Sequence, residues 1–373
     1  MRLTDLGLTI GRLQRGEHNA ITDVAGVSVG HCTIVSGDGP LVVGAGPVRT
    51  GVTVVRARPG SVRESPVFAG AYTLNGNGEC TGLEWLRESG LLTTDIALTN
   101  THSVGVVRVA LVADDAARAQ DERFWSMPVV AETYDGTLND INGQHVRPEH
   151  VRLALDALSD GPVPEGAVGG GTGMICHEFK GGIGTSSRLL PTEAGSWTVA
   201  ALVQANYGRR EDLRVAGLPV GAAIDRDQVP SPFADRRQQM LAPGSGSIII
   251  VLATDAPLLP DQCRRLAERA TVGLARVGGG CSDSSGDIFL AFATGNTGIP
   301  PEYYATSTPM TFEATAMPHQ ALTPLFEAAA DATEEAILNA MLAAQTVTGR
   351  DGITAHALPS DVVTALAQRA GLV

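Results

Sequence analysis

A serine stands where a linker-like stretch of the chain meets a predicted buried strand. Residues 225–246 are charged, contain three prolines and show no sustained period, which is typical of an exposed linker. Residues 247–258, SIIIVLATDAPL, start with a β-branched run that predicts a strand buried on both faces. Ser247 is therefore held firmly on one side only. Gly246 has no Cβ, so its carbonyl group is open to close approach.

This arrangement could support cleavage of the chain before Ser247. Its Oγ could attack the Gly246 carbonyl, form an ester by an N→O shift and release the upstream chain on hydrolysis. The new α-amine, with an ordinary pKa of about 7.7–8.0, could then serve as general base for the same hydroxyl. On spacing alone, a Ser-Gly-Ser linker that meets a strand by chance explains the pattern more simply.

Other candidate sites lack the spacing that their chemistry requires. His102–Ser103 and His177–Glu178 suggest a Ser-His-acid triad or a metal site. The chain contains neither H-E-x-x-H nor G-x-S-x-G, which favours ordinary structural histidines. The glycine clusters at 169–174 and 278–287 have no Walker lysine and no complete dinucleotide fingerprint, so tight turns are favoured over phosphate loops. We therefore expect no metal and no cofactor.

The elements that must position Ser247 mix buried strands with amphipathic helices. The helix predicted at 260–276 has Pro260 at its first position and an apolar stripe that recurs at helical spacing. Further strands are predicted at 196–208 and 287–295, and further helices at 83–89, closed by Gly90, and from Thr323 to Gln345, with one possible break. Helices over the outer faces of stacked sheets would bury both kinds of element. The periodicity predicts a layered α/β or α+β fold, with residues 1–373 in one domain.

Composition narrows the class of protein. With 43% hydrophobic residues the 373-residue chain can bury a large core, which excludes global disorder. A net charge of −13 without a basic stripe, and 4% aromatic residues, make a nucleic-acid partner a poor candidate. No run of about 18 apolar residues occurs, which predicts no membrane span. The charged first twenty residues do not resemble a signal peptide, and five cysteines without C-x-x-C favour a reduced, cytoplasmic protein.

Eight segments follow one another along nearly the whole chain. They are ITDVAGVSVGH (21–31), LNGNGECTG (74–82), AETYDGTLNDIN (131–142), GTGMICHEFKGGIGTSSR (171–188), QANYG (204–208), GSIIIVLATDAPL (246–258), SGDIFLAF (285–292) and ILNAMLAAQTVTGRDG (337–352). In this order they resemble the L-aminopeptidase/D-esterase and β-peptidyl aminopeptidase family. The resemblance implies a precursor that cuts itself at Gly246–Ser247 into a large chain, 1–246, and a small chain, 247–373, with Ser247 as its N-terminal nucleophile.

The resemblance implies a partner for this nucleophile. Ser285 matches the family's second serine, and Asp287 matches its nearby carboxylate. The β-peptidyl members have glutamate at this position. The shorter Asp287 would then need a shifted backbone or a water to reach Ser285 or the Ser247 amine. A turn-capping Ser-Gly-Asp before a strand is the alternative interpretation.

The same resemblance implies roles for three further residues. Asn206 matches the asparagine that stabilises the oxyanion, with an asparagine in a turn beside Gly208 as the alternative. Glu132 matches the glutamate that binds the substrate's free amine, with a solvated strand end as the alternative. Tyr134 either adds a hydrogen-bond donor near the tetrahedral intermediate or only packs.

The resemblance also implies a four-layer αββα sandwich, shared with ornithine acetyltransferase, and a homo-oligomer, a tetramer or larger, of cleaved protomers. The expected activity is release of N-terminal amino acids from short peptides, amides or esters. Ornithine acetyltransferase and nylon-oligomer hydrolase use a threonine nucleophile, so Ser247 favours the aminopeptidase. A non-cleaving pseudoenzyme or binding module is the non-enzymatic alternative. The choice among L-, D- and β-amino-acid substrates stays open.

Overall fold

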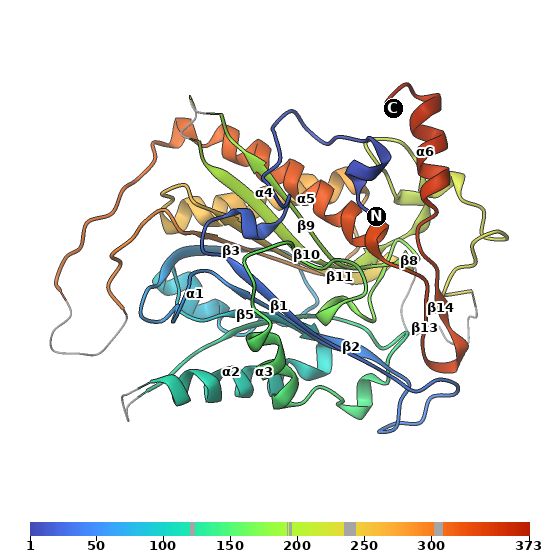
Figure 1. Ribbon diagram of the computed structural model, residues 1–373, viewed down its shortest axis with the longest axis horizontal. Helices are drawn as coiled ribbons and strands as arrows, with labels where there is room; N and C mark the ends of the chain where they lie inside the picture. The colour runs from blue at the N-terminus through green and yellow to red at the C-terminus, as the bar shows by residue number, and fades with distance from the viewer. Residues whose placement is uncertain (120–123, 192, 194–195, 235–243, 302–308) are drawn as a thin grey trace.

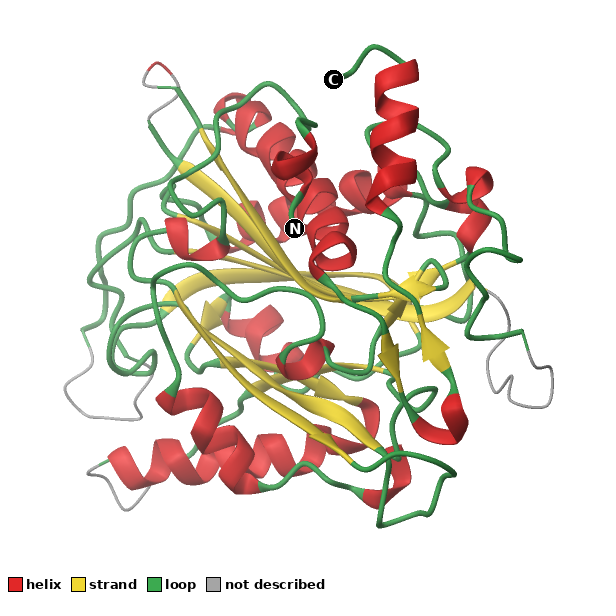
Figure 2. Cartoon of the chain, turned by 45° about the vertical axis from the view of Figure 1, so that its right-hand side comes forward, coloured by secondary structure: helices red, strands yellow, loops and turns green. Residues whose placement is uncertain are grey.

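Two β-sheets are stacked face to face, and helices cover the outer face of each (Figures 1 and 2). The computed structural model describes residues 1–119, 124–191, 193, 196–234, 244–301 and 309–373. Within these residues no helix is long and apolar enough to cross a membrane. The four layers agree with the predicted αββα sandwich.

The larger sheet has six strands in the order β4-β3-β12-β11-β10-β9. Its strands are β3 Val67–Gly76, β4 Leu91–Leu92, β9 Gly182–Leu189, β10 Thr198–Gly208, β11 Gly244–Thr254 and β12 Gly286–Ala293. The central strands β11 and β12 are parallel, and the other neighbouring pairs are antiparallel.

The smaller sheet has four strands in the order β1-β2-β5-β6, and only β5 and β6 are parallel. Its strands are β1 Ser28–Ser36, β2 Val48–Arg56, β5 Ile96–Asn100 and β6 Val129–Thr133. Two short hairpins lie outside both sheets: β7 Ile175–Cys176 with β8 Phe179–Lys180, and β13 Val347–Thr348 with β14 Thr354–Ala355.

Most of the α-helices lie on the two outer faces. The α-helices are α1 Leu83–Ser89, α2 Val104–Arg118, α3 Pro148–Asp156, α4 Pro260–Val277, α5 Thr323–Ala343 and α6 Ser360–Arg369. Helix α1 instead buries Leu83 and Leu86 in the core between the sheets. Apolar side chains of α4, α5 and α6 share a core with the six-stranded sheet, and those of α2 and α3 share one with the four-stranded sheet (Figure 1). A third core, with Ile249 and Leu290 on one side and Leu98 on the other, lies between the sheets.

Several predicted elements are confirmed. Helix α1 ends at Ser89 and is closed by Gly90, which has φ 71°, and α4 buries every member of its predicted apolar stripe. Residues 248–253 of β11 are fully buried, as the β-branched run predicted. The predicted linker ends too late, because β11 begins at Gly244, where it pairs with Gly208 of β10. Residues 235–243 of that linker lie outside the described part of the chain.

Candidate active site

Ser247 lies near the start of the central strand β11, between strands β10 and β12. It is directly opposite Asn206 of β10 and level with Gly286 of β12. Directly opposed residues of an antiparallel pair project from the same face, so Ser247 and Asn206 both face the four-stranded sheet. The main-chain N–H of Gly286 donates to Ser247 Oγ (3.2 Å), and Ser247 is only 6% exposed. The main chain of Ser247 is thus fixed by pairing on both sides, and its hydroxyl accepts a hydrogen bond from β12.

Gly246 is the residue whose carbonyl precedes this serine, and the structure leaves no room for a side chain there. Its φ is +150°, a region that favours glycine. A Cβ on Gly246 would lie 2.1 Å from the carbonyl oxygen of Asn206 and 2.8 Å from Cα of Tyr207. The close approach of β10 and β11 therefore requires glycine at this position.

Asp287 accepts hydrogen bonds from three directions. Ser285 Oγ donates to its Oδ1 (2.5 Å), Asn75 Nδ2 donates to its Oδ2 (2.7 Å), and the main-chain N–H of Ile248 also reaches the carboxylate. Burial raises the pKa of Asp287, although these hydrogen bonds oppose the rise. Asp287 contacts Ser285 directly, without a bridging water. The pairing of β12 with β3 does shift register between Asp287 and Ile288, where one strand carries an extra residue.

The Asn206 amide is oriented by two main-chain groups. The N–H of Ile175 donates to its Oδ1 (2.8 Å), and its Nδ2 donates to the carbonyl oxygen of Tyr134 (2.9 Å). These contacts fix which end of the amide is the donor. Nδ2 carries a second hydrogen, and the Asn206 side chain projects from the face that it shares with Ser247.

Glu132 lies near the end of β6, in the opposite sheet, and is 3% exposed. Its Oε1 accepts the main-chain N–H of Glu79 (3.0 Å), and its Oε2 accepts the hydroxyl of Thr101. Burial raises the pKa of Glu132, while these two hydrogen bonds oppose the rise. A buried carboxylate held in this way is a suitable partner for a small cation such as an ammonium group.

One cleft of about 420 Å³ joins the nucleophile and this carboxylate. It is lined by Gly76, Asn77, Gly78, Glu79, Thr101, Glu132, Tyr134, Gly246, Ser247 and Ser284. Tyr134 is half-buried, and burial raises the pKa of its phenol. Of the predicted residues, the structure thus gathers Glu132, Tyr134, Gly246 and Ser247 around one space. Asn206, Ser285 and Asp287 lie beside Ser247 in the sheet but do not line the cleft.

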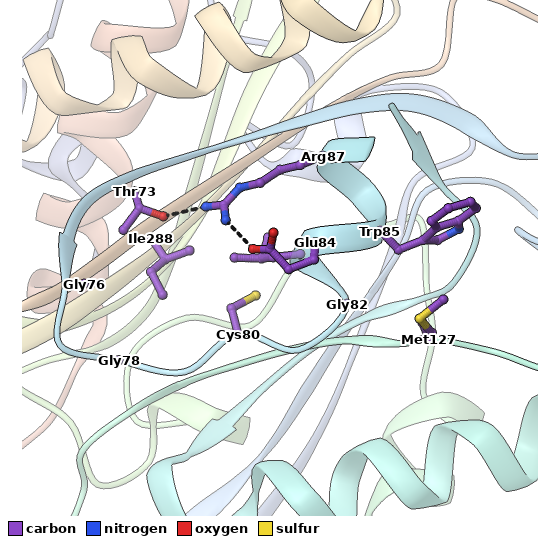
Figure 3. A pocket seen from close by; sticks show the side chains of 11 residues that line it. Thr73, Gly76, Gly78, Cys80, Gly82, Glu84, Trp85, Arg87, Met127 and Ile288 are labelled. Carbon is purple, nitrogen blue, oxygen red and sulfur yellow. Dashed lines mark hydrogen bonds and ion pairs between the residues drawn. The ribbon is translucent and has the colours of Figure 1, made fainter. Parts of the chain in front are cut away.

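A second hollow of about 360 Å³ adjoins the cleft, because Gly76 and Gly78 line both. The loop from Gly76 to Gly82 curves around it, with Cys80 and Ile288 inside the curve (Figure 3). Arg87 of α1 spans its mouth, donating to Thr73 Oγ1 (2.9 Å) and Glu84 Oε1 (2.8 Å). The bond to Thr73 ties α1 to β3, at the two ends of the glycine loop.

Three groups of the site were not predicted from the sequence. Asn75, Thr101 and the main-chain N–H of Glu79 hold the two carboxylates in place. Asn75 falls in the glycine-rich segment 74–82, but nothing in that segment distinguishes it from a turn residue. His177, by contrast, is structural as predicted: it is fully buried, its Nδ1 lies 2.7 Å from the carbonyl oxygen of Arg209, and burial lowers its pKa to about 4.

Among the described residues, no group of three or more His, Cys, Asp or Glu side chains lies close enough to hold a metal ion. A serine at the start of a central strand, in two stacked sheets covered by helices, is the architecture of the N-terminal-nucleophile hydrolases. Comparison with known proteins supports the same class.

The model of peptidase family S58 matches residues 19–355. The β-peptidyl aminopeptidase BapA of Sphingosinicella microcystinivorans is 48% identical over 99% of this chain and 92% of its own. A β-aminopeptidase structure from Burkholderia sp. has a TM-score of 0.92 at 56% identity, covering 100% of this chain and 99% of its own. The L-aminopeptidase D-Ala-esterase/amidase of Ochrobactrum anthropi, an Ntn-hydrolase variant, has a TM-score of 0.88 at 40% identity, covering 99% of both chains.

The chain therefore belongs to peptidase family S58 and is a serine-type aminopeptidase with an N-terminal-nucleophile hydrolase fold. The predicted family, fold class and type of enzyme are confirmed. The roles of individual residues, the cleavage of the chain and its state of assembly stay predictions.

Proposed function

We propose that the chain cleaves itself at Gly246–Ser247 and then acts as an aminopeptidase through the new N-terminal serine. The observation that carries this proposal is the cleft shared by Ser247, Gly246 and the buried carboxylate of Glu132. Attack of Ser247 Oγ on the Gly246 carbonyl breaks the amide bond and forms an ester. Water then hydrolyses the ester, which releases the carboxylate of Gly246 and leaves the α-amine of Ser247 free.

The free amine supplies the base for substrate hydrolysis. Its ordinary pKa of about 7.7–8.0 lets it accept the proton of Ser247 Oγ near neutral pH. The hydroxyl attacks the substrate carbonyl, the amine or alcohol leaves with a proton, and water hydrolyses the acyl-enzyme. Asp287 and Ser285 lie next to the main chain of Ile248 and Gly286, where they would orient the new amine. Asn206 would donate its second Nδ2 hydrogen to the oxyanion, with Tyr134 as an additional donor.

Glu132 selects substrates with a free amine. Its carboxylate lies in the same cleft as Ser247, so a substrate ammonium group on Glu132 would place the first carbonyl group of the substrate toward the nucleophile. Two β-aminopeptidase relatives share 48% and 56% identity with this chain and a third shares 42%, against 40% for the L-aminopeptidase. These identities favour short peptides or amides with an N-terminal β-amino acid. We also expect cleaved protomers to form a homo-oligomer in the cytoplasm, which gel filtration and cell fractionation would test.

A panel of amino-acid p-nitroanilides, run on the cleaved protein, tests the proposal. The panel should contain L-, D- and β-alanine derivatives, each with its N-acetylated counterpart. We expect hydrolysis of the free-amine compounds, fastest for the β-amino acid, and none of the acetylated ones. Equal hydrolysis of an acetylated and a free-amine pair would overturn amine recognition by Glu132.

A further inference from the structure

Lys180 is the only lysine in a chain with 27 cationic side chains, and it is completely buried. Its Nζ donates to three carbonyl oxygens: Met174 (2.7 Å), Gly181 (2.9 Å) and Gly171 (3.1 Å). All three hydrogens of an ammonium group are thus used, and all three acceptors belong to the main chain. The three carbonyls flank the β7–β8 hairpin, so this single side chain ties its two ends together.

One of these carbonyls belongs to the peptide group that holds Asn206. The Met174 carbonyl and the Ile175 N–H are the two ends of one peptide unit. The carbonyl accepts from Lys180 Nζ, and the N–H donates to Asn206 Oδ1 (2.8 Å). A continuous row of hydrogen bonds therefore runs from the ammonium group, through one peptide unit, to the Asn206 amide.

This row of hydrogen bonds fixes the position of the Asn206 amide and also polarises it. A cation on a carbonyl oxygen polarises its peptide unit and makes the N–H a stronger donor. A stronger bond to Oδ1 polarises the Asn206 amide in turn, which makes its Nδ2 hydrogens better donors. One Nδ2 hydrogen is used by the Tyr134 carbonyl, and the Asn206 side chain projects from the same face of the sheet as Ser247.

We propose that Lys180 is a positioning residue that holds and polarises the Asn206 amide for the oxyanion, acting through the Met174–Ile175 peptide unit. This inference rests on the proposed role of Asn206. It assigns a role to a buried cation that the catalytic steps do not otherwise use. Removal of Lys180 should weaken the stabilisation of the transition state and leave substrate binding at Glu132 unchanged.

The geometry explains why this cation is a lysine. A compact ammonium group can point three hydrogens at three convergent carbonyls, whereas the planar guanidinium fork of arginine suits flat, paired acceptors. Burial also costs free energy, and it lowers the pKa of Lys180 to about 7. The three hydrogen bonds offset part of that cost.

A double-mutant cycle tests the proposal, with Lys180→Met, Asn206→Ala and the double variant compared with the full wild-type chain. Loss of a direct oxyanion donor lowers kcat about 10²- to 10³-fold, so loss of a group one peptide unit behind it should lower kcat roughly 10-fold. The KM of a free-amine p-nitroanilide should change less than about 2-fold. The kcat values are expressed per cleaved protomer. The rates of Gly246–Ser247 cleavage of the same four proteins give a second double-mutant cycle.

In the Asn206→Ala background, Lys180→Met should lower kcat by no more than about 2-fold, because the group on which it acts is gone. The same 10-fold loss in both backgrounds, a wild-type kcat for Lys180→Met, or a loss confined to KM would each overturn the proposal. A wild-type kcat for Asn206→Ala would instead refute the proposed function of Asn206. If Lys180→Met does not fold, Lys180→Gln, which keeps a donor but no charge, is judged by the same criteria.

Arg188→Met is the matched control. Arg188 is equally buried, but it pairs with Glu335 (2.7 Å) and has no contact with the row that ends at Asn206. It should lower the temperature of unfolding and leave kcat per cleaved protomer unchanged. A 10-fold fall in kcat for Arg188→Met would show that loss of any buried cation has this effect, and it would overturn the proposal.

Discussion

Replacement of Gly246 by alanine should block maturation while Ser247 itself is unchanged. The added Cβ would lie 2.1 Å from the carbonyl oxygen of Asn206, whereas ordinary contact begins near 3.4 Å. It would also force an L-residue into a φ of +150°. The start of β11 therefore has to move away from β10, and it takes the scissile carbonyl and the serine hydroxyl with it.

Two costs lower the stability of the Gly246→Ala variant, and the displacement of the reacting groups lowers its cleavage rate. A residue held in a sparsely populated φ/ψ region costs about 1–3 kcal/mol, and an overpacked site costs about 1–3 kcal/mol more. A displacement of about 1 Å between reacting groups can lower a rate by about 10²-fold. We therefore expect the variant to fold, with lower stability, and to cleave about 10²-fold more slowly than wild type.

The assay is a time course of the purified precursor on a denaturing gel, with circular dichroism to check folding. Gly105→Ala is the matched control, because a Cβ on Gly105 of α2 would meet nothing within 4 Å. The control should cleave at the wild-type rate. Cleavage of Gly246→Ala at the wild-type rate would refute the claim that the close approach of β10 and β11 positions the scissile bond.

Further substitutions test the individual roles. Ser247→Ala should abolish both cleavage and turnover, whereas Ser247→Cys should keep slower cleavage, because a thiolate can replace the attacking oxygen; turnover by the alanine variant would identify a different nucleophile. Glu132→Gln should lower kcat/KM for a free-amine amide roughly 10- to 150-fold and remove the preference over the acetylated compound. In wild type, kcat/KM should fall as the pH falls through the raised pKa of Glu132, because the neutral carboxyl no longer attracts an ammonium group. Asn75→Ala should raise the pKa of Asp287 further, because one donor to its carboxylate is lost, and so move the acid limb of the kcat profile to higher pH; an unmoved limb would contradict a role for ionised Asp287.

Much of the fold could be predicted because its signals are local. The β-branched run after Ser247 predicted a buried strand, and the apolar stripe of residues 260–276 predicted α4. The start of β11 could not be predicted, since Gly244 and Ser245 look like part of a linker. They become strand because β10, far away in the sequence, offers Gly208 as a pairing partner. Tertiary pairing overrides local propensity at this boundary.

The site could be predicted only where the resemblance named its residues. Glu132 and Ser247 belong to different sheets, and no period in the sequence places them in one cleft. The groups that hold Glu132 come from the glycine loop and from the turn after β5, which brings Thr101 to the carboxylate. Lys180 did carry a signal, since it is the only lysine among 27 cationic side chains. The role of Lys180 could not be predicted, because it depends on the main-chain carbonyls that the folded β7–β8 hairpin brings together.

Sequencing of the N-terminus of the smaller species is the most direct test of the account. The protein is expressed from the full chain, purified without denaturation and separated on a denaturing gel. We expect two species, the smaller of which begins SIIIV, with Ser247 as its first residue. A smaller species with any other first residue, or full aminopeptidase activity in a chain that stays intact, would contradict the claim that Ser247 is an N-terminal nucleophile.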